Sequence, residues 1–283
     1  MSRPYFSRDR ITHFDNFSRH ADLAISKIPD KATAFDFQDL VSRFTMDSAT
    51  EFLFGVDVGS LGEPLAGTEG SNSNSNSSAR FAKAFSSVQE KIVTRFTLAN
   101  AWSYIEMFWD RTSEDMRVIH GYVEPILREK LEKKKRGELK IDKEGEEEAT
   151  LLDHLVQHTD DEKIIMDELI NILVAGRDTT ASTLTFLCYM LAANPAIFAK
   201  LRAEILDTVG PNAYPTFEDI REMKYMRAVV NEVLRVFPAA PLNNRECVRP
   251  TVLESEGTKY FVPAGASCIF SVHLMHLRKD LWG

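Results

Sequence analysis

The chain has 283 residues, of which 44% are hydrophobic and 27% charged, so it can bury a large core. Its formal net charge of −8 excludes a general nucleic-acid-binding protein, which needs a basic surface. The sequence has no run of 18 or more apolar residues and no apolar N-terminal segment. It therefore predicts neither a membrane-spanning helix nor a signal peptide within these residues.

The first half of the chain has the spacing of amphipathic helices. Apolar residues recur every three or four positions over 36–54, and Gly55 follows where a glycine can end a helix. The same spacing predicts helices at about 79–96 and 108–135. Between the first two helices, residues 59–79 contain a Ser-Asn tract of low complexity, for which we expect a flexible loop.

The middle of the chain predicts one helix much longer than the others. After a short helix at 150–158, Asp160 or Asp161 can cap a helix that ends near Ala193, before an Asn-Pro pair. Such a helix would have about 33 residues and a length of about 50 Å. Its second half is apolar almost all round, which is typical of a helix that lies inside a protein.

The pattern changes towards the C-terminus. Two further helices are predicted at 195–209 and 223–236, and short runs of β type then occupy 245–254, 258–262 and 267–272. Turn sequences that contain glycine separate these runs. The expected fold class is mainly α, with a long central helix and a small β region near the C-terminus.

The cysteines give no sign of a disulfide framework. Cys188, Cys247 and Cys268 are odd in number and widely spaced, and they form no CxxC metal site. We expect three reduced thiols, mostly buried, as in a protein of a reducing compartment.

The long helix carries polar residues in the middle of an apolar sequence, as AGRDTT at 175–180. Arg177 and Asp178 are costly to bury unless they are paired or face a water-lined cavity. Gly176 weakens the helix, and Thr179 can bond to the carbonyl four residues earlier. We expect a local opening that can hold a small ligand and relay protons, although a polar stripe on the helix surface explains the same residues.

Charged residues further along the chain, including Arg235 and Arg245, extend this pattern. Glu232 and Arg235 are spaced i, i+3 and so share one face of the helix predicted at 223–236. Taken alone, they can be an ordinary surface ion pair. Arg245 follows in the β region, and its guanidinium suits a carboxylate or phosphate partner.

Together and in this order, the motifs resemble the cytochromes P450. AGRDTT at 175–180 is similar to the AGxDTT of the family's long I helix, and the sequence from Glu232 to Arg235 to the ExxR of its K helix. The Phe-Pro pair before Arg245 looks like the family's continuation into its sheet.

The resemblance extends towards both ends of the chain. FVPAG at 261–265 and the stretch from His273 to Trp282 look like later parts of the family pattern. RPYF at 3–6 looks like the RPxF after the haem-contacting C helix. The match implies one partial cytochrome P450 domain over 1–283, most similar to fungal fatty-acid and alkane hydroxylases.

The resemblance implies a haem-thiolate monooxygenase as the parent protein. Asp178 and Thr179 would supply the protons that oxygen activation consumes, and Ala175 and Gly176 would line the haem pocket. Arg245 would bind a propionate of haem b.

The resemblance also assigns structural and substrate-contacting residues. Glu232 and Arg235 would be structural. The expected partners are NADPH–cytochrome P450 reductase and an apolar small molecule, at the cytosolic face of the endoplasmic reticulum membrane through an anchor outside these residues. Substrate would contact Ala239, Ala240, Leu242 and Asn243.

One part of the family pattern does not occur in this sequence. The haem-ligating cysteine of the family lies in an FxxGxxxCxG loop, and these 283 residues contain no such loop. Cys247 and Cys268 lack its glycine-rich surroundings, so we expect neither to ligate iron. The chain would be an internal fragment that is inactive by itself. A non-catalytic remnant and a haem-free helical binder of small molecules stay open as alternatives.

Overall fold

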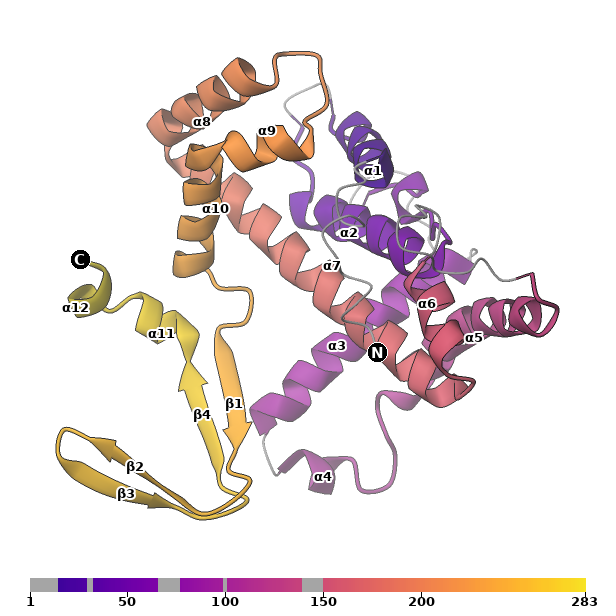
Figure 1. The fold of residues 1–283 in the computed structure, drawn as a ribbon, viewed down its shortest axis with the longest axis vertical. Helices are drawn as coiled ribbons and strands as arrows, with labels where there is room; N and C mark the ends of the chain where they lie inside the picture. The colour runs from indigo at the N-terminus through magenta and orange to yellow at the C-terminus, as the bar shows by residue number, and fades with distance from the viewer. Residues whose placement is uncertain (1–14, 30–32, 66–76, 99–100, 139–149) are drawn as a thin grey trace. The chain divides into compact units, whose positions relative to one another are not determined.

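The structure is a computed structural model of the chain. It describes residues 15–29, 33–65, 77–98, 101–138 and 150–283. The chain divides into two compact units, Met1–Ala181 (unit 1) and Ser182–Gly283 (unit 2), and each is described by itself. The expected fold class, mainly α with a small β region near the C-terminus, is confirmed (Figure 1).

Unit 1 is built from helices over its described residues (Figure 1). The longest, α7, begins in this unit and continues into unit 2. The elements are α1 (Asp15–Ser26), α2 (Phe37–Phe54), a 3-10 helix (Ser60–Gly62), α3 (Ser77–Leu98), α4 (Trp102–Ile105), α5 (Ser113–Lys135), α6 (Leu151–His158) and α7 (Glu162–Ala193).

Local capping explains why several of these helices begin and end where the sequence predicts. The carboxylate of Asp36 accepts a hydrogen bond from the amide of Asp39 at the start of α2, and Gly55 ends that helix with φ 73°. A side chain would be strained in that left-handed conformation. The carboxylate of Asp161 accepts from the amides of Lys163 and Ile164, so of the two expected caps Asp161 begins α7.

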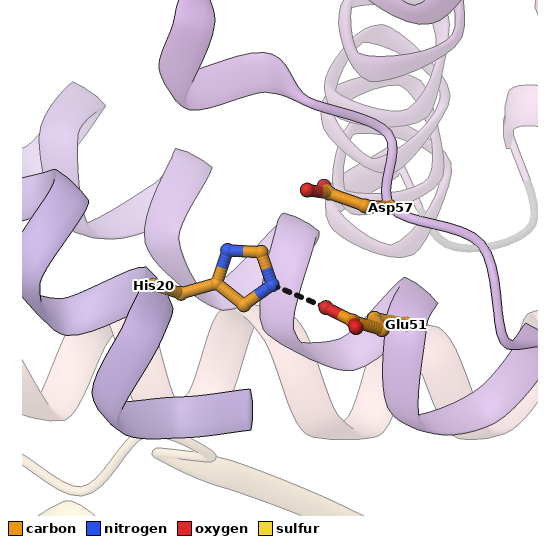
Figure 2. A group of neighbouring side chains, drawn as sticks. All are labelled: His20, Glu51 and Asp57. Atoms are coloured by element: carbon orange, nitrogen blue, oxygen red, sulfur yellow. Dashed lines mark hydrogen bonds and ion pairs between the residues drawn. The ribbon is translucent and has the colours of Figure 1, made fainter. Parts of the chain in front are cut away.

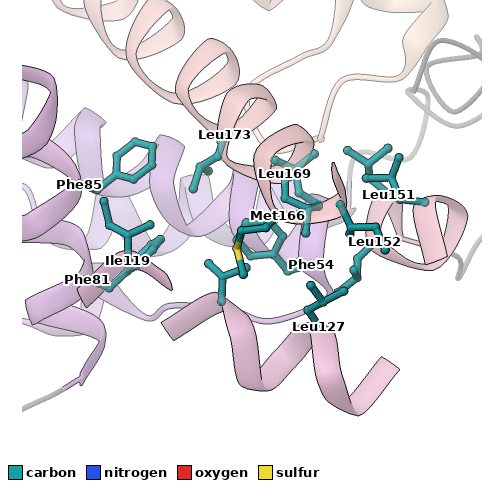
Figure 3. Close-up of a cluster of buried hydrophobic side chains, with 14 of the residues drawn as sticks. Phe54, Phe81, Phe85, Ile119, Leu127, Leu151, Leu152, Met166, Leu169 and Leu173 are labelled. Atoms are coloured by element: carbon teal, nitrogen blue, oxygen red, sulfur yellow. The ribbon is translucent and has the colours of Figure 1, made fainter. Parts of the chain in front are cut away.

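The core of unit 1 lies where α2, α3, α5, α6 and the first half of α7 meet (Figure 3). α2, α3, α5 and α7 contribute apolar faces, as their amphipathic spacing predicts, whereas α6 is buried over six consecutive residues. Each large apolar side chain that is fully buried stabilises unit 1 by about 2 kcal/mol. The largest contributors include Phe54, Phe81, Phe85, Ile119, Leu127, Leu151, Leu152, Leu169 and Leu173.

The described ends of the segment 59–79, expected to be a flexible loop, belong to ordered elements. Ser60 and Leu61 are buried in the 3-10 helix, because the buried carboxylate of Asp47 accepts hydrogen bonds from both backbone amides at 2.8 Å. At the other end, α3 begins at Ser77. The low-complexity tract at 66–76 lies outside the described residues.

The long helix α7 has 32 residues, close to the expected 33, and it is helical throughout. The expected local opening at 175–180 is therefore not present in its backbone. The expectation that its second half lies inside the protein is wrong for this structure, since Tyr189 is 65% exposed and Leu187 half-buried. An apolar sequence pattern identifies a helix face that favours burial. It does not show whether another element packs against that face.

Unit 2 continues from the end of α7 into helices and two separate strand pairs (Figure 1). The run expected at 245–254 is two strands, because Val248 to Pro250 break it. Three short helices, α9, α11 and α12, were not predicted. The elements are α8 (Pro195–Thr208), α9 (Phe217–Glu222), α10 (Lys224–Val236), β1 (Leu242–Glu246), β2 (Thr251–Ser255), β3 (Thr258–Val262), β4 (Ser267–Ser271), α11 (Val272–His276) and α12 (Lys279–Trp282).

Both strand pairs are antiparallel. β2 and β3 form a hairpin around Glu256 and Gly257, both of which have positive φ. β1 pairs with β4, and this places Arg245 opposite Cys268. The strands are exposed over most of their length, since each sheet has only two strands.

This exposure corrects the expectation for the cysteines. All three are free thiols, but Cys188 and Cys268 are exposed and Cys247 is half-buried. Among the described residues, no single helix is long and apolar enough to cross a membrane, and α7 with α8 meets that requirement only as a pair bent by 114°.

Candidate functional site

The AGRDTT segment lies on α7, close to the end of unit 1. The hydroxyl of Thr179 donates a hydrogen bond of 2.7 Å to the carbonyl oxygen of Ala175, which is the back-bond that the sequence predicts. Ala175, Gly176 and Thr179 are exposed, and a Cβ added to Gly176 would meet nothing within 4 Å. This face of α7 therefore has small side chains and open space next to Gly176.

Arg177 and Asp178 lie on other sides of the same turn. Arg177 is 7% exposed, and its Nη1 donates to Oδ1 of Asp178 at 3.1 Å. Burial raises the pKa of the half-buried Asp178 above its ordinary value, and the charge of Arg177 opposes that rise. Burial likewise lowers the pKa of Arg177. Of the two alternatives expected for buried charges in this helix, pairing or a water-lined cavity, the structure shows pairing.

The sequence did not identify the helix that supplies the remaining partners. Ser86 on α3 accepts a hydrogen bond of 3.0 Å from Nη2 of Arg177, and the guanidinium lies 5.5 Å from the ring centre of Phe85. Gln89, one turn further along α3, lowers the pKa of Asp178. A signal was present, since Ser86 and Gln89 are polar at i, i+3 beside the buried Phe85 and Val88.

Glu232 and Arg235 form a fork-shaped pair on α10 in unit 2. Nε and Nη2 of Arg235 donate to the two carboxylate oxygens of Glu232 at 2.8 and 2.6 Å. Nη1 donates to the carbonyl of His276 at 2.7 Å and so joins α10 to α11. The pKa of Glu232 is lowered by this bonding. This is more than an ordinary i, i+3 pair, because it also fixes a segment far along the chain.

Arg245 lies on β1 with its guanidinium exposed. Nη1 donates to the carbonyl of its neighbour Asn244, and the cation lies 5.8 Å from the ring centre of Phe270. The residues expected to contact substrate are at the entry to this strand. Ala239 and Ala240 lie between α10 and β1, and Leu242 and Asn243 are the first residues of β1.

The structure groups the predicted site residues in two sets. Ala175, Gly176, Asp178 and Thr179 lie together on α7 in unit 1, whereas Glu232, Arg235, Arg245 and the residues at 239–243 lie in unit 2.

Each unit contains residues that fit part of a haem. In unit 1, the small, open face at Ala175 and Gly176 leaves room for a flat macrocycle. In unit 2, the exposed guanidinium of Arg245 suits a propionate. The cysteine chemistry does not fit a ligand, because the Sγ of Cys247 donates to the carbonyl of Arg249 at 3.0 Å and Cys268 lies inside strand β4.

A second group of ligand-type side chains lies where α1 meets α2 (Figure 2). His20, Glu51 and Asp57 bring potential ligand atoms within 4.8 Å of one another, and Nε2 of the buried His20 lies 2.7 Å from Glu51. Arg19 binds the same carboxylate of Glu51 and lies 4.0 Å from Asp57. Since a cation there would have to displace the guanidinium, we interpret this group as an ionic brace between two helices.

Comparisons with known proteins place this arrangement in a family. The family model for cytochrome P450 matches residues 13–283. The chain is 35% identical over 296 residues to cytochrome P450 52A3-B of Candida maltosa and 33% identical over 294 residues to cytochrome P450 52E1 of Candida apicola. It is 34% identical over 290 residues to cytochrome P450 monooxygenase himC of Aspergillus japonicus.

Each of these alignments includes the whole chain. They cover 55%, 55% and 50% of the three relatives, so the chain spans about half the length of the curated relatives it matches. The ordered motifs, the mainly helical fold and the match over 13–283 agree. The chain belongs to the cytochrome P450 family.

Proposed function

We propose that the protein containing this chain is a haem-thiolate monooxygenase. It inserts one atom of dioxygen into an apolar organic substrate, such as a fatty acid or an alkane. The observation that carries the proposal is the back-bonded hydroxyl of Thr179 on a face of α7 with open space next to Gly176, one residue along the chain from the half-buried Asp178. The bound haem would supply the binding and activation of dioxygen.

The chain's own residues would manage protons on the oxygen side of the haem. The raised pKa of Asp178 lets its carboxyl hold a proton at a higher pH than an exposed aspartate. The bond from Thr179 to the carbonyl of Ala175 fixes the hydroxyl in one orientation. We therefore assign proton delivery to these two side chains, and the lining of the pocket to Ala175 and Gly176.

The residues of unit 2 would hold the cofactor and the substrate. Arg245 offers guanidinium donors to a propionate, and Ala239, Ala240, Leu242 and Asn243 would contact the substrate. Glu232 and Arg235 would be structural, in agreement with their bonds to each other and to α11. Electrons would come from NADPH through cytochrome P450 reductase, with the parent protein at the cytosolic face of the endoplasmic reticulum membrane.

A back-bonded threonine outside the site gives a matched control for the test. Thr97 on α3 donates to the carbonyl of Val93 at 2.9 Å and is exposed. In the haem-containing protein expressed from the complete coding sequence, Thr179→Ala should lower the product formed per NADPH oxidised, and Thr97→Ala should not. Asp178→Asn should slow product formation by about 100-fold. Equal coupling in Thr179→Ala and Thr97→Ala would contradict the proposal.

A haem-free binder of apolar molecules is the second candidate, and one feature of unit 2 favours it. A hollow of about 390 Å³ between the end of α7, α8 and α10 is lined mostly by apolar side chains, among them Leu191, Ile197 and Val229. This candidate predicts saturable binding of lauric acid to the 283-residue chain without haem, weakened by Val229→Glu. The same chain, given haem and carbon monoxide under reduction, should show no absorbance band of thiolate ligation.

A further inference from the structure

Arg177 is a cation where the rest of its helix face is apolar. It lies one turn from Leu173 on one side and one turn from Ala181 on the other, and all three are buried. Taking a guanidinium out of water is costly unless its donors are bonded. Its position therefore needs a reason that the fold alone does not supply, because an apolar residue would continue the buried stripe.

The contacts of Arg177 connect two helices to one carboxyl. Nη2 donates to the hydroxyl of Ser86 on α3 at 3.0 Å, and Nη1 donates to Asp178 at 3.1 Å. The ring of Phe85 lies under the guanidinium at 5.5 Å. The hydroxyl of Ser86 and the ring of Phe85 hold the planar guanidinium against α3. Its Nη1 therefore has a fixed direction towards Asp178.

Two buried donors at this contact have no hydrogen-bond partner among the described residues. They are Nε of Arg177 and Nε2 of Gln89. Gln89 lies near enough to Asp178 to favour its charged form. Unpaired buried donors are rare in folded proteins, so these two need an explanation. A neighbouring carboxyl that releases and regains a proton, as proposed for Asp178, supplies one.

We propose that Arg177 is a positioning residue, which is held by Ser86 on α3, orients the carboxyl of Asp178 and stabilises that carboxyl in its ionised form. The inference deepens the proposed function, on which it rests, by making proton delivery from α7 depend on contact with α3. Gln89 also favours the charged form of the same carboxyl. The other charge that acts on Arg177 is Asp39 of α2, which itself pairs with Arg43 at 2.9 Å.

The test measures the ionisation of Asp178 directly in the 283-residue chain. Aspartate carboxyls labelled with ¹³C are titrated by NMR, and the signal of Asp178 is identified by its loss in Asp178→Asn. Arg177→Met fills a similar volume without charge and should raise the pKa of Asp178 by about one unit or more. Lys130→Met is the matched control, because it removes a cation paired with the buried Asp153 elsewhere in unit 1. It should leave the signal unchanged.

An unchanged pKa of Asp178 in Arg177→Met would overturn the inference. So would an equal shift in Lys130→Met, because that would be a general effect of a loosened fold. If Arg177→Met does not fold, Arg177→Lys replaces it. A lysine keeps the charge but lacks the fork, and it should raise the pKa of Asp178 by less than the methionine would.

Ser86→Ala tests the anchor. It should shift the Asp178 signal in the wild-type chain and leave it unchanged in the Arg177→Met chain, because the hydroxyl acts only through the guanidinium. Independent shifts in the two backgrounds would contradict that route. The coupling of NADPH oxidation to product in Asp178→Asn separates the two proposals. Unaltered coupling in that variant would overturn the role of Asp178 in catalysis, and the titration alone decides whether Arg177 controls its charge.

Discussion

Unit 1 and unit 2 are made of similarly well-formed elements, but they differ in how much apolar surface those elements bury. Among the described residues, the buried hydrophobic side chains of unit 2 are Leu201, Met223 and Val233, whereas unit 1 contains a continuous core across five helices. Both units have large apolar side chains that are more than 60% exposed, such as Phe108 in unit 1 and Phe261 in unit 2, so the difference lies in the core. Well-formed helices and strands therefore do not by themselves produce a buried core.

The difference follows from the layers in each unit. The helices of unit 1 pack against one another on several sides, with α3 against α5, α1 against α2, and α6 against both α2 and α5. The strands of unit 2 form two pairs, and a two-stranded sheet is at best marginally stable in water without further cover. We expect the same substitution to have different consequences in the two units.

The largest contrast should come from removing one aromatic ring in each unit. Phe54 is 0% exposed and Phe261 is 69% exposed. Phe54→Ala should lower the free energy of unfolding by about 3–5 kcal/mol, because it leaves a cavity in the core. Phe261→Ala should cost less than about 1 kcal/mol, the typical value of a cross-strand contact. Urea denaturation of the 283-residue chain, followed by circular dichroism, measures both, and similar losses would mean that the two units are equally well packed.

Ion pairs should show a smaller contrast of the same kind. The carboxylate of Asp153 is 2% exposed and accepts hydrogen bonds from Lys130 and from the amide and hydroxyl of Thr150. Asp153→Ala should cost about 3 kcal/mol, because it leaves buried donors unpaired. Glu232→Ala in unit 2 removes a side chain that is 60% exposed and should cost less than about 1 kcal/mol.

A control for the Lys130–Asp153 ion pair lies on the same helix as Lys130. Lys133 forms an exposed i, i+4 pair with Glu129 at 2.7 Å, and Lys133→Ala should change the unfolding free energy by less than about 0.5 kcal/mol. If Lys133→Ala and Asp153→Ala have equal effects, burial does not determine the strength of these pairs.

The smallest expected effect is a difference in the sign of pH dependence. Burial raises the pKa of Asp47 in unit 1, and the nearby Asp57 adds to the rise. The unfolded chain therefore loses this proton at a lower pH than the folded chain. Stability falls as the pH rises from the pKa of Asp47 in the unfolded chain to its pKa in the folded chain. Relative to Asp47→Asn, the wild-type chain should gain stability as the pH falls through the raised pKa towards the usual value of 3.8.

Glu232 in unit 2 should behave in the opposite way. Its bonds with Arg235 lower its pKa, so the stability they contribute is present above the usual value of 4.5 and is lost as the pH falls through the lowered value. Relative to Glu232→Gln, the wild-type chain should lose stability on acidification below pH 4.5. Urea denaturation over this pH range measures both pairs, and changes of the same sign in both would contradict the assignment.

The candidate site could be predicted in part. The back-bond of Thr179 to Ala175 follows from a spacing of four residues, and the pair of Glu232 with Arg235 follows from a spacing of three. Helix periodicity fixes both of these contacts. The bond of Arg235 to the carbonyl of His276 spans 41 residues, and nothing in the local pattern specifies it.

The sequence by itself determined the limits of the helix between Asp36 and Gly55, the mainly α fold class and the motifs that place the chain in its family. It also restricted the cap of α7 to Asp160 or Asp161. Caps and motifs involve neighbours within a few positions, so a linear sequence contains them. Only the tertiary structure decided that Arg177 finds Ser86, 91 residues away, and that most of the strands are exposed. Such contacts depend on which surfaces the packed helices bring together, and no short stretch of sequence specifies that.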